Sequence, residues 1–577
     1  MIKRVYSHAV VPSLLTIFIL AACVGEERGA DQTPAPTTAV PEPTTEPISP
    51  PIVAPDSLYK GTLGIPWWND VVFYEVFVRS FSDSDGDGVG DINGLIEKLD
   101  YLNDGNPNTT DDLGVTGLWL MPIMESPSYH GYDVVDYFKV DEEYGTGEDF
   151  RRLIEEAQSR GIRVIVDLVT NHTSSEHPWF EASRNPDSEK RAWYVWEDED
   201  PGYRGPQGQQ VWHQTPEGYY YALFWDGMPD LNYENPEVTE AIQEAARYWL
   251  EDMGVDGFRL DAIKHIVENG QLQENTQGTH EWLKGFYTFY KDVNPNALAV
   301  GEAWTGTQQV LKYTGDEVDI AFQFDLAQAV LNSADNGLAP MVGKEQKTVV
   351  ESFPPGQYAT FLTNHDQNRV MSRLGGDENK AKVAATWLLT SPGVPFVYYG
   401  EEIGMMGTKP DEDIRRPMQW RHDDGLSVGF TEGRPWRYPA EDYEERSVAH
   451  QTDDAGSLLS HYRSLIHLRN DHEALRVGQW TPVETDSSDV YAYLRTTEEE
   501  ALLVLINFSE DAVDDYGLSL LEGPLSEDLT PRMLFGTADP ALMSVNEIGG
   551  FDSYQPIDTL PPQSSFVFEL VSSGEAG

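Results

Sequence analysis

The sequence predicts an α/β fold: a (β/α)8 TIM barrel with a small domain inserted after its third strand and an antiparallel β-sandwich at its C-terminal end. Between residues 71 and 402, eight short apolar runs alternate with helix-like segments, as in such a barrel. The interval between the third and fourth runs is too long for a simple helical crossover. Beyond residue 475, runs with the two-residue alternation of β-strands predict the sandwich.

The chain begins with a segment that resembles a lipoprotein export signal. Lys3 and Arg4 precede the apolar run 9–22, which is short for a membrane span, and residues 20–23 read LAAC, similar to the lipobox of bacterial lipoproteins. We predict that residues 1–22 are a signal peptide and that Cys23 is lipidated. The exported protein would then be held by lipid at the cell surface or in the envelope, facing outside the cytoplasm. An ordinary signal peptide with an incidental cysteine is the alternative.

Residues 23–60 are predicted to be a linker, because they are rich in Pro, Thr and Glu and poor in large apolar residues. The barrel is predicted over residues 61–170 and 233–475. A doubly wound open sheet would have fewer strands and a glycine-rich phosphate turn, which the sequence lacks. The predicted strands are VVFYEVFV (71–78), VTGLWLMP (115–122), RVIVDLV (163–169), GFRLDA (257–262), ALAVGEA (297–303), IAFQF (320–324), YATFLTNHD (358–366) and PFVYYGEE (395–402), and helix-like segments such as 148–160 and 236–253 lie between most of them.

Two further segments complete the predicted domains. Residues 171–232, rich in Trp, Tyr, Pro and Gly, are the inserted domain. Residues 476–577 are the β-sandwich, which follows a helix near 457–470 and contains strand-like runs at 490–497, 501–509 and 564–571.

The composition limits the partners of this chain. Its formal charge is −58, from 97 acidic and 39 basic residues, and a field of that sign repels nucleic acid and anionic lipid. The charge suits a neutral or cationic ligand, and it also suits a salty habitat. Cys23 is the only cysteine, so the sequence offers no disulfide framework and no cysteine metal site. We expect a monomer, although the sequence leaves the oligomeric state open.

Three carboxylates lie at the predicted C-terminal ends of three strands, the face that carries the active site of a barrel. Asp261, Glu302 and Asp366 would meet at one rim. Retaining glycoside cleavage needs two carboxyls roughly 5–5.5 Å apart, one ionised and one protonated. Arg259 is expected to hold the pKa of Asp261 down, while Asp366 and the apolar Trp304 are expected to raise the pKa of Glu302. Ordinary salt bridges at the rim are the alternative interpretation of each acid.

The segments DLVTNH, GFRLDAIKH, GEAW and FLTNHD resemble the signature regions of the α-amylase family, glycoside hydrolase family 13, and the resemblance covers nearly all of residues 65–577. It implies Asp261 as nucleophile, Glu302 as general acid/base and Asp366 as the residue that stabilises the transition state. The resemblance also makes the insertion that family's domain B and the tail its domain C. The residues that it implies around the sugar are Tyr132, as a stacking aromatic, with His172, Arg259 and His365.

Other residues bear on specificity, again through resemblance. Ala262, after the nucleophile, is similar to α-1,4-acting members, whereas α-1,6-acting relatives tend to have Val there. Lys264 and His265 are similar to the pair on the leaving-group side of α-amylases, and MPDLN (228–232) resembles a subgroup intermediate between oligo-1,6-glucosidases and neopullulanases. In contrast, Asp133 and Arg415 match a pair that grips the non-reducing end of the substrate in exo-acting glucosidases.

We therefore predict an endo-type lipoprotein α-amylase that cleaves α-1,4 bonds of starch and maltooligosaccharides through a covalent intermediate. An exo-acting α-glucosidase or a transglycosylase on short α-glucans is the alternative, because a sugar can intercept the intermediate instead of water. Two more distant alternatives are a non-catalytic surface glycan-binding lipoprotein and a calcium-dependent adhesin. The first would be expected to have lost a catalytic acid, yet all three are present.

A loop after the first strand predicts calcium binding. Asp83, Asp85, Asp87, the Val89 carbonyl and Asp91 have the spacing of an EF-hand loop, and hard oxygen ligands favour Ca²⁺. The glutamate expected at the twelfth position is Gly94, and a strand precedes the loop in place of a helix. The oligo-1,6-glucosidase-like branch of the family carries a structural calcium in this loop; a solvated acidic turn is the alternative. A second calcium is possible near Asn171, which matches a ligand in many α-amylases.

Overall fold

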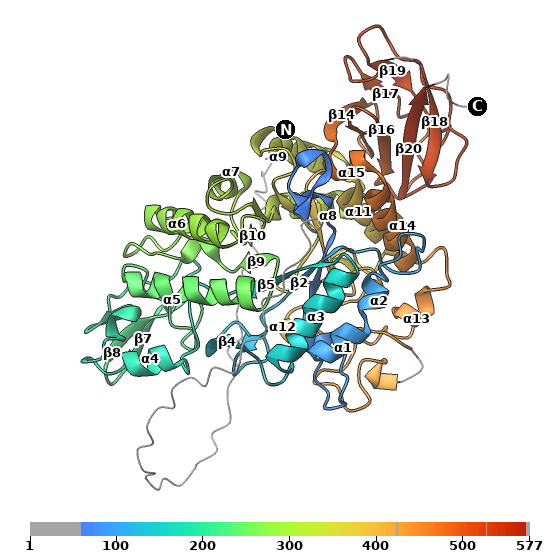
Figure 1. Ribbon diagram of the computed structural model, residues 1–577. Helices are drawn as coiled ribbons and strands as arrows, with labels where there is room; N and C mark the ends of the chain where they lie inside the picture. The colour runs from blue at the N-terminus through green and yellow to red at the C-terminus, as the bar shows by residue number, and fades with distance from the viewer. Residues whose placement is uncertain (1–58, 423–424, 527, 573–577) are drawn as a thin grey trace, which may run out of the picture. The chain divides into compact units, whose positions relative to one another are not determined.

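The computed structural model describes residues 59–422, 425–526 and 528–572 (Figure 1). Its largest sheet has eight parallel strands in the order β11-β10-β9-β5-β2-β1-β13-β12. A parallel bridge between Phe322 and Ala359 joins the two ends of this order, so the predicted (β/α)8 barrel is confirmed. The strands are β1 (Phe73–Val76), β2 (Gly117–Leu120), β5 (Arg163–Leu168), β9 (Gly257–Leu260), β10 (Leu298–Gly301), β11 (Ile320–Ala321), β12 (Ala359–Thr360) and β13 (Val394–Tyr398).

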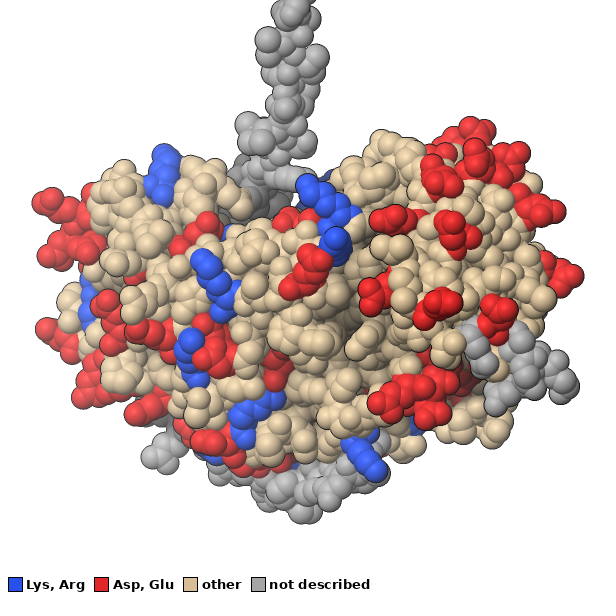
Figure 2. All heavy atoms as spheres, turned by 90° about the horizontal axis from the view of Figure 1, so that it is seen from above, with Lys and Arg blue, Asp and Glu red and all other residues tan. Residues whose placement is uncertain are grey.

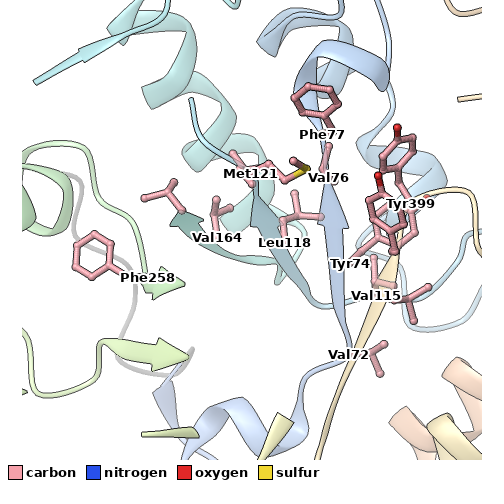
Figure 3. Packing of buried hydrophobic residues seen from close by; sticks show 14 of the residues in the cluster. Val72, Tyr74, Val76, Phe77, Val115, Leu118, Met121, Val164, Phe258 and Tyr399 are labelled. Carbon is pink, nitrogen blue, oxygen red and sulfur yellow. The ribbon is translucent and has the colours of Figure 1, made fainter. Parts of the chain in front are cut away.

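Side-chain alternation along these strands separates two cores. On β1, Phe73 belongs to a cluster with residues of neighbouring strands and stacks on Phe396 of β13 at 4.6 Å, inside the barrel. Tyr74 and Val76 belong to the larger cluster between the strands and the surrounding helices (Figure 3). Because successive side chains of a strand point to opposite faces, Glu75 lies on the interior side with Phe73. This alternation brings polar residues into the barrel interior at the C-terminal end of the strands.

Helices follow most of the barrel strands, and their ends carry local signals. The first turn of α3 has a capping box in which Thr146 and Asp149 bond each other's backbone N–H groups, and Asn235 caps α5 ahead of Pro236. The helices of ten residues or more are α3 (Gly147–Ser159), α5 (Pro236–Arg247), α6 (Gln277–Val293), α8 (Phe324–Asn336), α9 (Pro340–Ser352), α11 (Glu378–Thr390) and α14 (Leu458–Asp471).

The structure shortens three predicted strands. Residues 78–80 form a 3₁₀ turn after β1, and Phe324 begins α8 instead of ending a strand. Only Ala359 and Thr360 of the predicted run 358–366 are paired as a strand, because the chain then leaves the sheet.

Three smaller sheets accompany the barrel, and the smallest pairs β3 (Met124–Glu125) with β4 (Asp136–Val140) antiparallel. Between β5 and β9, the strands β6 (Trp196–Glu197), β7 (Trp212–Thr215) and β8 (Gly218–Tyr221) form an antiparallel sheet, and α4 (Pro178–Ser183) precedes them. The C-terminal sheet is antiparallel and has the order β18-β20-β16-β15-β14-β17-β19. Its strands are β14 (Gln479–Thr485), β15 (Val490–Thr496), β16 (Ala501–Asn507), β17 (Leu518–Leu520), β18 (Leu529–Phe535), β19 (Phe551–Tyr554) and β20 (Ser564–Ser572).

The strands at both ends of the C-terminal sheet share one core. Phe551 of β19 and Leu518 of β17 belong to the same buried cluster as Leu505 of β16 and Phe568 of β20. This packing confirms an antiparallel β-domain after the barrel.

The surface reflects the acidic composition. Figure 2 shows a face on which acidic side chains form several groups and basic side chains lie among them. Among the described residues, none of the helices has the length and apolar character needed to cross a membrane. The predicted signal peptide and Cys23 lie outside the described residues.

Candidate active site

The candidate site lies where β5, β9 and β10 end. Asp167 is the next-to-last residue of β5, Arg259 is on β9, and Glu302 directly follows β10. Side chains alternate between the two faces of a strand. Those of Asp167, Arg259 and Glu302 lie on the face that points into the barrel at its C-terminal end, instead of toward the helices. The sequence prediction that such residues converge at one rim is therefore met by contacts between side chains.

The guanidinium of Arg259 joins three carboxylates. It is fully buried, and its Nη1 donates to Asp167 Oδ1 at 2.8 Å and to Asp261 Oδ1 at 2.7 Å. Its Nη2 donates to Glu302 Oε2 at 2.9 Å. A planar guanidinium fixes such partners in one plane, so Asp261 and Glu302 are held on neighbouring nitrogens of one group.

A strained backbone turn also ties Glu302 to the nucleophile candidate. Ala262 has φ 48° and ψ 37°, a left-handed conformation that is uncommon for a residue with a Cβ and costs about 1–2 kcal/mol. This turn directs the Ala262 N–H to Glu302 Oε2 at 3.0 Å. The turn after Asp261 therefore positions Glu302 as well.

Burial is the largest influence on the pKa values of Glu302 and Asp261. It raises the pKa of Glu302 to about 7, against the opposing effect of Arg259 and with the help of Asp261 and Asp366. Burial also raises the pKa of Asp261, and Arg259 only reduces that shift. Arg259 lowers the pKa of Asp261 as expected, but burial outweighs it, so the expectation that this pKa is held below its usual value is wrong. Trp304 does not enclose Glu302 either, since its ring is exposed and stacks on Phe324.

The pKa of Asp366 is shifted in the opposite direction to the pKa values of Glu302 and Asp261. Burial pushes its pKa up, but the cations Arg415, Lys409 and Arg259 favour the ionised form, and the pKa lies below its usual value. Arg415 Nη2 donates to Asp366 Oδ1 at 2.9 Å, and Arg415 Nε donates to the His365 carbonyl at 3.0 Å. Asp366 is thus ionised at neutral pH, while Glu302 is partly protonated.

Tyr132 is held flat against His365, with ring centroids 5.5 Å apart and 16° between the planes. Its hydroxyl bonds His365 Nε2 at 2.6 Å and donates to Asp167 Oδ2 at 3.1 Å. His365 Nδ1 bonds Glu75 Oε1 at 2.5 Å. Burial lowers the pKa of His365, which makes the ring neutral. The predicted stacking residue therefore has a fixed orientation.

His172 and His265 lie near the exposed side of the site. Their rings are within 5.2 Å and 6.0 Å of the Phe224 ring, and burial lowers the pKa of each histidine to about 4. His172 Nδ1 lies 3.0 Å from Asn171 Oδ1, and the ring also bonds the backbone of Tyr132. Lys264 Nζ donates to Glu274 at 2.9 Å and to the Trp304 carbonyl at 3.0 Å.

Asp133 and Arg415, the predicted pair for a non-reducing end, have separate partners. Asp133 Oδ1 accepts from Ser126 Oγ at 2.9 Å and from Ser128 Oγ. Arg415 binds Asp366 and lies 3.5 Å from Asp411. Both residues are buried, and no ion pair joins them to each other among the described residues.

The acidic loop after β1 brings three of its predicted ligands together. Carboxylate oxygens of Asp83, Asp85 and Asp91 lie within 4.8 Å of one another, and this donor set of hard oxygens fits Ca²⁺. Backbone N–H groups orient Asp83, whose Oδ1 and Oδ2 accept from Gly86 and Gly88 at 2.7 and 2.8 Å. Asp87 is not part of this group, and its Oδ1 accepts from the N–H of Val89 at 2.8 Å.

A second group of acceptors surrounds Asn171. Its Nδ2 donates to the His265 carbonyl at 2.8 Å. Nearby, burial raises the pKa of Asp230, from the MPDLN segment, to about 7, and burial together with Asp230 raises the pKa of Glu268. The carboxyls of Asp230 and Glu268 are hydrogen-bonded to each other, and Asp230 also bonds Asn171. The sequence left the partners of a possible second calcium near Asn171 unidentified, and these two carboxyls lie beside that residue.

Two residues of the site were missed as candidates. Asp167 bonds Arg259 and Tyr132, and Glu75 bonds His365. Glu75 is the single charged residue of the run 71–78, and Asp167 is the single acid of the run 163–169, which begins with Arg163. Burying an isolated charge is costly, so such a residue is itself a signal of a buried polar site.

Comparisons with known proteins agree with this geometry. The model of the α-amylase catalytic-domain family matches residues 75–478. A protein named Alpha-amylase 3 from Dictyoglomus thermophilum is 42% identical over 451 residues, covering 77% of this chain and 86% of that protein. An oligo-1,6-glucosidase from Parageobacillus thermoglucosidasius is 34% identical over 526 residues, covering 77% of this chain and 91% of that protein.

Solved structures give the same result. The crystal structure of the α-amylase from H. orenii has a TM-score of 0.75 and 42% identity, and the match covers 87% of this chain and 99% of that chain. The trehalulose synthase from Pseudomonas mesoacidophila has a TM-score of 0.75 and 30% identity, with 88% and 100% covered. Together with the site geometry, these matches show that the chain is a glycoside hydrolase and belongs to the α-amylase family, glycoside hydrolase family 13.

Proposed function

We propose that this enzyme hydrolyses internal α-1,4 bonds of starch and maltooligosaccharides with retention of configuration. The observation that carries the proposal is the bridge from one guanidinium, that of Arg259, to Asp261 at 2.7 Å and Glu302 at 2.9 Å. Retaining enzymes need two carboxyls roughly 5–5.5 Å apart, and a shared guanidinium favours such close spacing.

In the first step, the Asp261 carboxylate attacks the anomeric carbon and forms a glycosyl ester while the bond to the leaving oxygen breaks. Glu302 gives its proton to that oxygen, for which a pKa of about 7 is well suited. The leaving sugar departs as a neutral alcohol, and Glu302 becomes a carboxylate.

In the second step, the Glu302 carboxylate takes a proton from water, and the resulting hydroxyl group attacks the anomeric carbon. The ester to Asp261 breaks, so both carboxyls return to their starting states. Ionised Asp366 stabilises the positive charge that develops on the sugar, and the fixed ring of Tyr132 lies beneath it.

Several observations favour the endo reading. Arg415 is bound to Asp366 and Asp133 is bound by two serines, and these separate partners support a cleft that the pair leaves open. Two relatives are named α-amylases. The alternative, an exo-acting α-glucosidase or a transglycosylase, is favoured by relatives named oligo-1,6-glucosidase and trehalulose synthase.

The time course of products from maltoheptaose and starch separates these functions. Mixed maltooligosaccharides at the start support endo attack, and glucose alone supports exo attack. Products longer than the supplied maltoheptaose would indicate transfer. The Glu302→Gln variant is the control, and equal activity of this variant would contradict the mechanism.

Calcium, lipidation and location remain proposals that rest on the sequence and on one acidic cluster. Asp83, Asp85 and Asp91 would hold a structural Ca²⁺ that braces the loop after β1 and takes no part in bond cleavage. Cys23 would carry the lipid that anchors a monomeric enzyme outside the cytoplasm. Membrane fractionation of cells that express the natural chain or its Cys23→Ser variant tests the anchor, because only the natural chain should sediment with the membrane.

A further inference from the structure

Trp304, two residues after Glu302, forms a rigid aromatic platform at the edge of the site. One face of its ring stacks on Phe324 at 4.7 Å and 10°, while 47% of the residue stays exposed. Its carbonyl accepts from Lys264 Nζ at 3.0 Å, so both its ring and its backbone are held. A large aromatic side chain that is fixed and still open to solvent is typical of a binding surface.

An open groove lined by polar residues begins two residues after this platform in the chain. It has a volume of about 660 Å³. Its walls come from α7 (Thr307–Val310), the first turn of α8 and the face of α9. The lining residues are Gly306, Thr307, Gln308, Gln309, Lys312, Asp325, Glu345 and Thr348. Most of them carry the hydroxyl, amide and carboxylate groups that recognise sugar hydroxyls.

The floor of the groove is preorganised. Thr307 N donates to Asp325 Oδ2 at 2.9 Å, and Thr307 Oγ1 donates to Glu345 Oε1 at 2.8 Å. Asp325 Oδ1 and Glu345 Oε2 make no hydrogen bond to the described residues, so each carboxylate keeps one oxygen for a ligand. Two carboxylates and a single lysine, Lys312, line the groove, which disfavours an anionic ligand.

We propose that this groove binds additional glucose units of the α-glucan on the leaving-group side, which reach it across Trp304. The inference rests on the proposed function. Lys264, which resembles a leaving-group-side residue of α-amylases, bonds the Trp304 carbonyl, and the groove begins only two residues later, at Gly306. The groove would thus make the enzyme prefer longer chains.

The test compares long and short substrates in conservative variants. Glu345→Gln and the exposed Gln308→Ala should each lower kcat/KM for maltoheptaose by roughly threefold to tenfold, the effect of one lost hydrogen bond, and leave kcat/KM for maltotriose unchanged. Glu351→Gln is the matched control, because Glu351 is an exposed carboxylate on α9 that is not among the lining residues. Thermal melting of each variant checks its folding, and the exposed Gln308→Ala provides the test even if Glu345→Gln is unstable.

Binding separates this inference from the catalytic proposal. In the Glu302→Gln background, titration calorimetry with maltoheptaose should show a similar loss of affinity when Glu345→Gln or Gln308→Ala is added. That loss supports the groove even if the wild-type enzyme hydrolyses no α-glucan, an outcome that would overturn only the proposed function. Unchanged maltoheptaose affinity in both variants overturns the groove. An equal loss of kcat/KM on maltotriose and maltoheptaose overturns it as well.

Discussion

The protonation of Glu302 gives a quantitative test of the proposed chemistry. Burial raises the pKa of Glu302 to about 7, and the first step requires the protonated form. A group with that pKa is about 90% protonated at pH 6 and about 10% protonated at pH 8. We therefore expect kcat/KM for maltoheptaose to fall roughly tenfold between pH 6 and pH 8, measured as the rate of release of reducing ends.

A substrate with a better leaving group identifies the titrating residue. Fluoride needs little help from an acid, so α-maltosyl fluoride should lose most of this pH dependence. The Glu302→Gln variant should cleave maltoheptaose about 10²–10⁴-fold more slowly yet still release fluoride. Burial also raises the pKa of Asp167 to about 7, and its titration would affect both substrates alike. The same decline with both substrates would therefore refute the role of Glu302.

Three further predictions concern stability. Chelation of calcium should lower the melting temperature before activity is lost, by an amount equivalent to about 2.7 kcal/mol for an ion at 100 times its dissociation constant. The Asp83→Asn variant should abolish this effect. A loss of activity at an unchanged melting temperature would contradict a purely structural role of the calcium. Arg469 donates to three buried carbonyls at 2.7–3.0 Å, so Arg469→Met should cost about 2–5 kcal/mol in urea unfolding, whereas Arg532→Met on the surface should change stability by less than about 1 kcal/mol. Burial raises the pKa of Asp256 to about 6 and of Glu401 to about 8. A carboxyl with a raised folded-state pKa gives its full stability below the unfolded pKa and loses it as pH rises through the folded pKa, so calorimetry should show a lower melting temperature at pH 8 than at pH 5, and an equal one would refute this.

The barrel could be predicted because its strands are continuous apolar runs, as in parallel sheets covered on both faces. The runs 163–169 and 395–402 correspond to β5 (Arg163–Leu168) and β13 (Val394–Tyr398) within a few residues. The shortness of β11 and β12 could not be predicted. Residues 361–366 have strand-like composition, but they leave the sheet and carry Asp366 to Arg415, a partner about fifty positions away in the chain.

The residues of the candidate site were easier to predict than their electrostatics. The sequence places Arg259 two positions before Asp261, and the contact between them follows from strand alternation. The sequence does not show that Asp167 and Glu302 bind the same guanidinium, or that Arg259 and its three carboxylates are buried. Burial is the largest cause of the pKa shift of Asp261, with Arg259 opposing it, so the direction of the shift could be obtained only from the packed structure.

The left-handed turn at Ala262 links bond preference to backbone geometry. The resemblance noted from the sequence associates Ala at this position with action on α-1,4 bonds and Val with action on α-1,6 bonds. A β-branched side chain at φ 48° is far less tolerable than Ala, and the same residue holds Glu302 through its N–H group. An attempt to redirect the enzyme toward branch points by Ala262→Val would therefore disturb the general acid as well as the binding cleft. A change made here for linkage selectivity is therefore expected to alter the strength of the acid as well.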